Sequence, residues 1–270
     1  MGHTPFLPNG LTQRLLQKGF TTSELLASGA SMMSKKDGQL IDTLRRRVVF
    51  PVRDNEGVVG FVGRRDVIID RGGKCENQGH LPPKYMNFTD TALYRKDEAL
   101  IWSTGPAGPG DQVVVVEGVM DCLAVAITAS RSGRLTGDRR IVPVCTSGKN
   151  MSSGQWKAIK AIGPSRVAVA LDSSDDVTRA EVEKHVCGAR AAGIADVVVV
   201  NWDGAGQGVK DPAEVLQSHG AGAVMARLAA AKPLSPPLPS RLARRGREVE
   251  EMSDGALPAP PPGPDLGLST

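Results

Sequence analysis

The 270-residue sequence predicts an α/β protein in which a basic α+β region precedes a mainly parallel sheet with helices on both faces. Two observations predict this fold. From residue 112 onward, apolar strand patterns alternate with helical patterns, as in parallel sheets that are covered by helices. Before that point, the sequence shows short helical patterns and a hairpin pattern together with many Lys and Arg. We therefore predict domains at residues 1–108 and 109–232, separated near the glycine- and proline-rich residues 105–110.

The N-terminal region begins with two predicted helices between residues 11 and 29. The apolar face of the first helix is formed by Leu11, Leu15 and Leu16. Thr22 or Ser23 suits the N-cap of the second helix, because a hydroxyl oxygen can accept a hydrogen bond from the first turn. A β-hairpin is predicted next, since two runs rich in β-branched residues flank a turn that ends in glycine. These runs are residues 47–53 and 58–64.

The C-terminal region contains a series of predicted strand–helix units. The strands are residues 112–117, 141–145, 166–171 and 196–200, and the helices are residues 119–130, 152–161, 177–192 and 212–230. The strands are short apolar runs, as expected for strands that are buried on both faces. Residues 233–270 are rich in proline and poor in large apolar residues, so this tail is predicted to be disordered.

Composition argues against several classes of protein. No apolar run reaches the roughly 20 residues that span a bilayer, and no signal-peptide pattern is found, so we expect a cytoplasmic protein with no membrane partner. The net charge of +4 is modest, so binding of a polyanion would require local clusters of positive charge. No zinc site and no disulfide framework are expected, because no C-x-x-C pair occurs among Cys75, Cys122, Cys145 and Cys187.

Acidic residues follow several of the predicted strands. Glu117 comes directly after a run of valines, Asp172 follows the third strand, and Asp211 lies beyond the fourth. The carboxyl ends of parallel strands meet in one crevice, so these carboxylates should lie close together, with Asp121 a helical turn after Glu117. Gathered carboxylates repel one another unless cations lie between them, and oxygen ligands favour Mg²⁺ or Mn²⁺. The sequence therefore predicts a metal centre for phosphoryl transfer.

Each candidate residue also has a purely structural interpretation. Glu117 and Asp121 could simply stabilise the positive end of the following helix dipole. That interpretation does not explain why Asp172 and Asp211 stand at corresponding strand ends. Lys and Arg are usually solvated surface residues, so a single basic residue is weak evidence for a binding site.

These acidic positions resemble the TOPRIM domain that DnaG-type primases share with topoisomerases and some nucleases. The resemblance rests on Glu117-Gly-x-x-Asp121, on the strand end at Asp172 and on Lys210-Asp211-Pro212. Upstream, three segments follow in order the basic subdomain that precedes TOPRIM in bacterial DnaG-type primases, namely residues 42–52, 57–64 and 83–87. The resemblance covers about residues 8–220 and implies a primase catalytic core.

The resemblance implies synthesis of short RNA primers on a single-stranded DNA template from ribonucleoside triphosphates. The implied catalytic residues are Glu117, Asp172 and Asp211. The implied ligands of two or more Mg²⁺ or Mn²⁺ ions are Glu117, Asp121, Asp172, Asp175, Asp176 and Asp211. The implied nucleic-acid and nucleotide contacts are Arg45, Arg47, Arg64, Lys84, Asn87 and Lys96. Charge agrees with this assignment, because residues 45–96 contain 11 Lys or Arg against 6 Asp or Glu.

The sequence departs from the family pattern in three respects. DnaG-type primases carry Asp-x-Asp after the third strand, whereas Ser174 stands at the second position here and leaves Asp175 or Asp176 to replace it. Ala213 occupies the place of a further acid. Family primases also carry a zinc-binding module and helicase-contacting helices, and neither pattern is found here. We expect a core encoded by a phage or mobile element, with a replicative helicase and a separate zinc-binding template-recognition chain as partners.

Two other functions fit parts of the sequence. A TOPRIM-type metal-dependent nuclease would use the same acids to hydrolyse a phosphodiester, but it would not need the ordered basic motifs. A catalytically weakened single-stranded-DNA-binding subunit of a split primase would keep those motifs and tolerate Ser174 and Ala213. The residues of the site, and not the fold, must decide among these functions.

Overall fold

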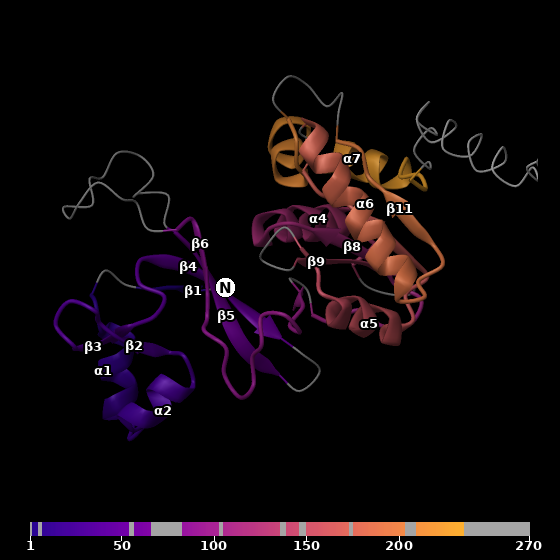
Figure 1. Ribbon diagram of the computed structural model, residues 1–270. Helices are drawn as coiled ribbons and strands as arrows, with labels where there is room; N and C mark the ends of the chain where they lie inside the picture. Colours follow the sequence, from indigo (N-terminus) through magenta and orange to yellow (C-terminus); the bar gives the residue numbers. More distant parts are fainter. Residues whose placement is uncertain are drawn as a thin grey trace, which may run out of the picture. The chain divides into compact units, whose positions relative to one another are not determined.

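The order of helices and strands follows the sequence prediction, with short helices and antiparallel strands before a series of strand–helix units (Figure 1). The computed structural model describes residues 2–4, 7–53, 57–65, 83–102, 105–135, 139–145, 150–172, 175–202 and 209–234. For residues 101–102 and 175–178 it describes the backbone alone. The tail after residue 234, predicted to be disordered, lies outside the described residues.

The N-terminal region contains helices α1 (Gly10–Gln17) and α2 (Thr22–Ala27) and two small antiparallel sheets. One sheet pairs β2 (Ser31–Met33) with β3 (Leu40–Asp42). The other has the order β1-β4-β5-β6 and consists of β1 (Gly2–His3), β4 (Arg47–Arg53), β5 (Val58–Arg65) and β6 (Tyr85–Asn87). The predicted hairpin is confirmed, because β4 and β5 pair antiparallel along their length.

Two details of the helical pair differ from the prediction. Leu11 and Leu16 are 38% and 41% exposed, and the buried residue of α1 is Thr12. Asp42 accepts hydrogen bonds from the backbone N–H of Thr12 at 2.8 Å and from its hydroxyl at 2.6 Å, so polar contacts, not an apolar face, attach α1 to β3. The N-cap of α2 is Thr21, which forms a capping box with the third residue of the helix.

The C-terminal region contains a five-stranded sheet with the order β11-β10-β8-β9-β7. Strands β8 (Gln112–Val116), β9 (Ile141–Cys145), β10 (Arg166–Val169) and β11 (Val197–Val199) are parallel, and β7 (Ile101–Trp102) pairs antiparallel with β9. The helices are α4 (Val119–Arg131), α5 (Ser153–Ile162), α6 (Asp175–Ala191) and α7 (Pro212–Ala229). The predicted, mainly parallel sheet is confirmed.

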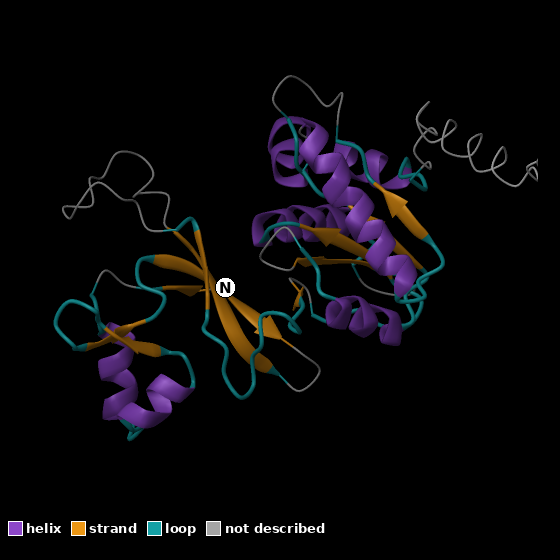
Figure 2. Ribbon diagram, in the orientation of Figure 1, coloured by secondary structure: helices purple, strands orange, loops and turns teal. Residues whose placement is uncertain are grey.

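Successive valines of β8 explain why helices cover both faces of this sheet (Figure 2). Val114 and Val116 pack in one buried cluster with residues of α4 and α7, whereas Val113 and Val115 pack in a second cluster with residues of α5 and α6. All four valines are at most 1% exposed. Because both faces are apolar, polar side chains can gather only beyond the ends of the strands.

The N-terminal and C-terminal regions share buried apolar contacts. Phe50, Val52 and Val62 of the hairpin belong to the same buried cluster as Val114 of β8. The chain up to Leu234 forms one compact unit, so a domain boundary near residue 108 stays a prediction. Within the described residues, no helix combines the length and the apolar character needed to cross a membrane.

Candidate active site

One cavity collects the acidic residues that follow the strands of the parallel sheet. Glu117 directly follows β8, Asp172 lies beyond the end of β10, and Asp211 is the N-cap residue of α7. These residues and Asp121, in the first turn of α4, line a cavity of about 460 Å³. The fold therefore brings together carboxylates that are far apart in the sequence, as expected for the carboxyl ends of parallel strands.

Burial and mutual repulsion change the acidity of these carboxyl groups. Burial, together with the charges of Asp211 and Asp172, raises the pKa of Asp121 to about 7. Burial, together with the charges of Glu117 and Asp211, raises the pKa of Asp172 to about 6. Burial also raises the pKa of Asp211, and the charge of Glu214 adds to this effect. The cavity therefore holds negative charge that a bound cation would stabilise.

The local backbone shows that Glu117 does not act as a helix cap. The N-cap residue of α4 is Gly118, so Glu117 lies outside the helix. Instead, Glu117 Oε1 accepts a hydrogen bond from the backbone N–H of Asp172 at 3.4 Å, across neighbouring strands. A Cβ atom at Gly118 would lie 3.1 Å from Asp121 Oδ2 and 3.7 Å from the Tyr85 hydroxyl, so glycine leaves this part of the cavity open.

Asp211 and Glu214 interact at the start of α7. Asp211 Oδ1 accepts a hydrogen bond from the Glu214 N–H at 2.7 Å, and Glu214 Oε2 accepts one from the Lys210 N–H at 3.0 Å. Asp211 therefore caps the helix and lines the cavity at the same time. The sequence analysis missed Glu214, which also lines the cavity and follows Ala213 directly. The capping-box spacing from Asp211 to Glu214 was the signal that could have identified it.

Basic residues of the N-terminal region line the same cavity. They are Arg64 of β5 and Lys84, which directly precedes β6. Tyr85 lies beside both of them, because it pairs with Arg64 across β5 and β6 and its ring centroid is 5.8 Å from Lys84 Nζ. Burial raises the pKa of the Tyr85 hydroxyl, and a hydrogen bond with Arg64 opposes this shift. The sequence analysis missed Tyr85 as a site residue, although it lies within residues 83–87, one of the three segments that resemble the basic subdomain of DnaG-type primases.

The other predicted nucleic-acid contacts lie outside this lining. Arg45 donates a hydrogen bond from Nη1 to the carbonyl oxygen of Asp42 at 2.9 Å. Arg47 is only 3% exposed, and its guanidinium lies inside the N-terminal region instead of on its surface. Asn87 is half-buried in β6, and the side chain of Lys96 is exposed. The described structure therefore places Arg64 and Lys84 beside the acids, and the others at greater remove from the cavity.

The proposed metal ligands are only partly described. Asp175 and Asp176 open helix α6, but their side chains lie outside the described residues, as does Ser174. Among the side chains that are described, no group of three His, Cys, Asp or Glu has the arrangement of a complete metal site. The oxygen-only donors of the cavity nevertheless fit Mg²⁺, which proteins commonly bind through one or two carboxylates, with water and substrate phosphates as the other ligands.

The raised pKa values predict how pH and metal act on stability. Because the folded protein holds protons on Asp121 and Asp172 above the ordinary pKa of 3.8, these groups contribute stability at low pH that is lost as pH rises through about 6 to 7. Without metal, the melting temperature of Asp121→Asn should therefore exceed that of the unsubstituted protein by more at pH 8 than at pH 5. Mg²⁺ should raise the melting temperature of the unsubstituted protein more at pH 8. Thermal melts in chelator and in Mg²⁺ measure both differences, and a difference independent of pH would contradict the prediction.

Known proteins are similar to this chain in sequence and in fold. The family model for the N-terminal domain of the DNA primase catalytic core matches residues 1–103. The DNA primase of Deinococcus radiodurans is 33% identical over 129 residues, which cover 46% of this chain and 20% of that protein. The matching part of this chain thus spans about a fifth of the length of that relative.

Two solved structures show the same fold. The RNA polymerase domain of Mycobacterium tuberculosis primase DnaG aligns with a TM-score of 0.65 and 22% identity, over 94% of this chain and 76% of that one. The DnaG primase catalytic domain bound to ssDNA aligns with a TM-score of 0.63 and 21% identity, over 86% of this chain and 65% of that one. Residues 1–103 of this chain therefore match the family of the N-terminal domain of the DNA primase catalytic core, and the chain as a whole has the fold of the DnaG catalytic domain.

Proposed function

We propose that this chain is a primase-type RNA polymerase core that makes short RNA primers on single-stranded DNA. The observation that supports this most strongly is the shared cavity, in which Glu117, Asp172 and Asp211 lie beside Arg64 and Lys84. Nucleotidyl transfer brings together a triphosphate, a primer end and a template, which are all polyanions. A site for this reaction needs carboxylates to hold cations and basic side chains to bind phosphates, and this cavity contains both.

The residues have distinct proposed roles. Glu117, Asp172 and Asp211, with Asp121, would hold Mg²⁺ or Mn²⁺, which when bound lowers the pKa of the attacking hydroxyl and neutralises the leaving pyrophosphate. The Asp172 N–H orients Glu117 through Oε1, which leaves its other carboxylate oxygen for a ligand or a proton. Arg64 and Lys84 would bind phosphate groups of template or nucleotide. Zinc has no proposed part in this chemistry.

The proposed partners follow from this role. Single-stranded DNA is the proposed template, which agrees with the DnaG catalytic domain whose structure was solved with ssDNA. Ribonucleoside triphosphates are the proposed substrates. A replicative helicase and a separate zinc-binding chain that recognises the template are proposed as protein partners, on the family resemblance alone.

A binding subunit of a split primase is the second candidate function. The observation in its favour is Ala213, an uncharged residue in the cavity lining at the place of a family acid. Glu214 lies in the same lining, and its charge raises the pKa values of Asp172 and Asp211, so the cavity retains a further acid near them. The two candidates differ in whether the chain alone joins nucleotides.

A synthesis assay tests the proposed function directly. We expect the purified chain, incubated with single-stranded DNA, labelled ribonucleotides and Mg²⁺ or Mn²⁺, to produce short RNA whose formation requires both template and metal. Reactions without template, and reactions with chelator, are the controls. DNA binding without synthesis would favour the binding subunit, and metal-dependent degradation of labelled DNA would favour the nuclease.

A further inference from the structure

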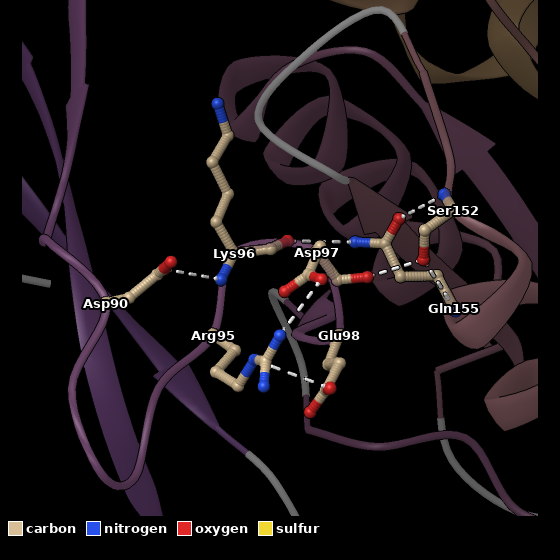
Figure 3. A network of polar contacts seen from close by, with 7 residues as sticks. All are labelled: Asp90, Arg95, Lys96, Asp97, Glu98, Ser152 and Gln155. Atoms are coloured by element: carbon tan, nitrogen blue, oxygen red, sulfur yellow. Dashed lines mark hydrogen bonds and ion pairs between the residues drawn. The ribbon is translucent and has the colours of Figure 1, made fainter.

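A polar network joins the loop that carries Lys96 to the start of helix α5 (Figure 3). At its centre is Gln155, a side chain that is only 2% exposed. Gln155 Nε2 donates hydrogen bonds to the carbonyl oxygens of Ala99 at 2.7 Å and of Lys96 at 3.3 Å. Gln155 Oε1 accepts a hydrogen bond from the Ser152 N–H at 2.9 Å, as part of the capping box of α5. One buried amide therefore caps a helix and binds the loop.

The backbone of Lys96 is held on both sides. Its N–H donates a hydrogen bond to Asp90 Oδ1 at 3.0 Å, and its carbonyl oxygen accepts the one from Gln155. The Ser152 hydroxyl donates a further hydrogen bond to the carbonyl oxygen of Asp97. These contacts determine the course of the loop around Lys96 without using its side chain.

The charged residues next to Lys96 pair with one another, which leaves the Lys96 ammonium group available to bind an anion. Arg95 lies 3.4 Å from carboxylate oxygens of Asp97 and of Glu98, so the neighbouring charges pair with one another. Figure 3 shows the Lys96 side chain pointing away from this group. Among the described residues, no carboxylate pairs with the Lys96 ammonium, and that side chain is exposed.

We propose that Gln155 is a positioning residue that holds Lys96 where its ammonium meets a nucleic-acid phosphate. The proposal rests on the proposed function and on the contact of Lys96 with template or nucleotide that the family resemblance implies. A loop that is ordered before binding loses less conformational entropy when the polyanion arrives, so the buried amide raises affinity through Lys96 although it touches no phosphate. The residue comes from the C-terminal region and acts on a basic residue of the N-terminal region.

Gln155→Glu is the sharpest variant. Glutamate keeps an oxygen that accepts from the Ser152 N–H, so the capping box of α5 remains possible. A carboxylate cannot donate to the carbonyl oxygens of Lys96 and Ala99, so the contact with the loop is lost. Gln155→Met provides a second variant that removes these hydrogen bonds without burying a charge. Ile159→Val is the matched control, because Ile159 is a buried residue of the same helix and does not contact the loop through hydrogen bonds.

The measurement is the salt dependence of single-stranded DNA binding, in chelator, for both Gln155 variants, Lys96→Ala and the double variants. Lys96→Ala should reduce the slope of log K against log salt by about 0.7, the value for one phosphate contact on a single strand. Each Gln155 variant should weaken binding and reduce the slope by up to the same amount. In the Lys96→Ala background, the Gln155 substitutions should have no further effect. Ile159→Val should leave the slope unchanged.

Two outcomes for the Gln155 variants would overturn the proposal. One is additive losses from Gln155 and Lys96, and the other is an unchanged slope in folded Gln155→Met when Lys96→Ala lowers it. An unchanged slope in Lys96→Ala itself would also overturn it, because Lys96 would then contact no phosphate. The proposed function would fail separately, through absence of primer synthesis by the unsubstituted chain, so the two failures are distinguishable.

Discussion

Glu117→Gln is expected to reduce primer synthesis by about 10² to 10³-fold, the size of effect seen when a single charge-stabilising group is removed from an active site. Glutamine has the shape of glutamate, and its Oε1 can still accept the hydrogen bond from the Asp172 N–H. The substitution therefore removes the negative charge and keeps the hydrogen bond between the ends of the two strands. Rates of ribonucleotide incorporation at saturating Mg²⁺ provide the measurement.

Two further measurements separate loss of chemistry from loss of structure. Single-stranded DNA binding in chelator should stay nearly unchanged, because the carboxylate of Glu117 is required only when cations and triphosphate are present. The metal-free melting temperature should not fall, because the charge of Glu117 repels Asp172. Asp196→Asn is the matched control, because that carboxylate is 43% exposed, pairs with Arg166 and lies outside the cavity lining. Full synthesis by Glu117→Gln would exclude Glu117 from the catalytic centre.

The parallel sheet could be predicted from the sequence because its signal is local. Strands that are buried on both faces must be apolar along their whole length, and the four valines that form most of β8 meet this condition. The helix expected at residues 119–130 is observed at Val119–Arg131. The convergence of Glu117, Asp172 and Asp211 was also predictable, because it depends only on which end of each parallel strand a residue follows.

The contacts that the sequence could not reveal are pairings between distant side chains and backbone. Thr12 is buried because Asp42, far along the chain, accepts its hydrogen bonds, and no periodicity shows this. Residues 45–47 are consecutive arginines in a segment with excess positive charge, so composition alone suggests that all of them face a polyanion. The structure instead turns Arg47 inward, because Gly63 on the neighbouring strand leaves space for its side chain. Which arginine is buried depends on that tertiary space and not on its own sequence neighbours.

Arg47 has an unusual environment for a charged residue. Its Nη1 donates to the carbonyl oxygens of Pro83 at 2.8 Å and of Gly63 and Lys84 at 3.3 Å each. Among the described residues, no carboxylate pairs with it. Burial lowers the pKa of Arg47, and the charges of Arg65 and Arg45 add to this effect. The guanidinium therefore donates hydrogen bonds to the backbone around Lys84.

Arg47→Met is expected to lower the free energy of unfolding by about 2–4 kcal/mol, because it leaves buried carbonyl oxygens without their charged donor. Removing a buried charge should itself be favourable, but the lost hydrogen bonds should cost more. Methionine can occupy the space of the aliphatic part of the arginine side chain, but it donates no hydrogen bond to these carbonyl oxygens. The same variant should weaken single-stranded DNA binding, because the segment that carries Lys84 is released. Chemical denaturation and DNA titration across salt concentrations measure the two effects. When Arg47→Met is combined with Lys84→Ala, the loss of DNA affinity should be smaller than the sum of the two separate losses.

Two companion variants decide whether Arg47 acts through its charge or through its hydrogen bonds. Arg47→Lys keeps the charge, but a single ammonium lacks the planar fork that serves several carbonyl oxygens, so it should restore little of the lost stability. Gly63→Ala keeps Arg47 itself, but its Cβ would lie 2.6 Å from Arg47 Cδ and displace the side chain, so it should reproduce the defect of Arg47→Met. If Arg47 contacted phosphate directly, Arg47→Lys would retain the salt slope of DNA binding, and losses from Arg47→Met and Lys84→Ala would add. That result would mean that Arg47 contacts the nucleic acid itself and does not act through the segment that carries Lys84.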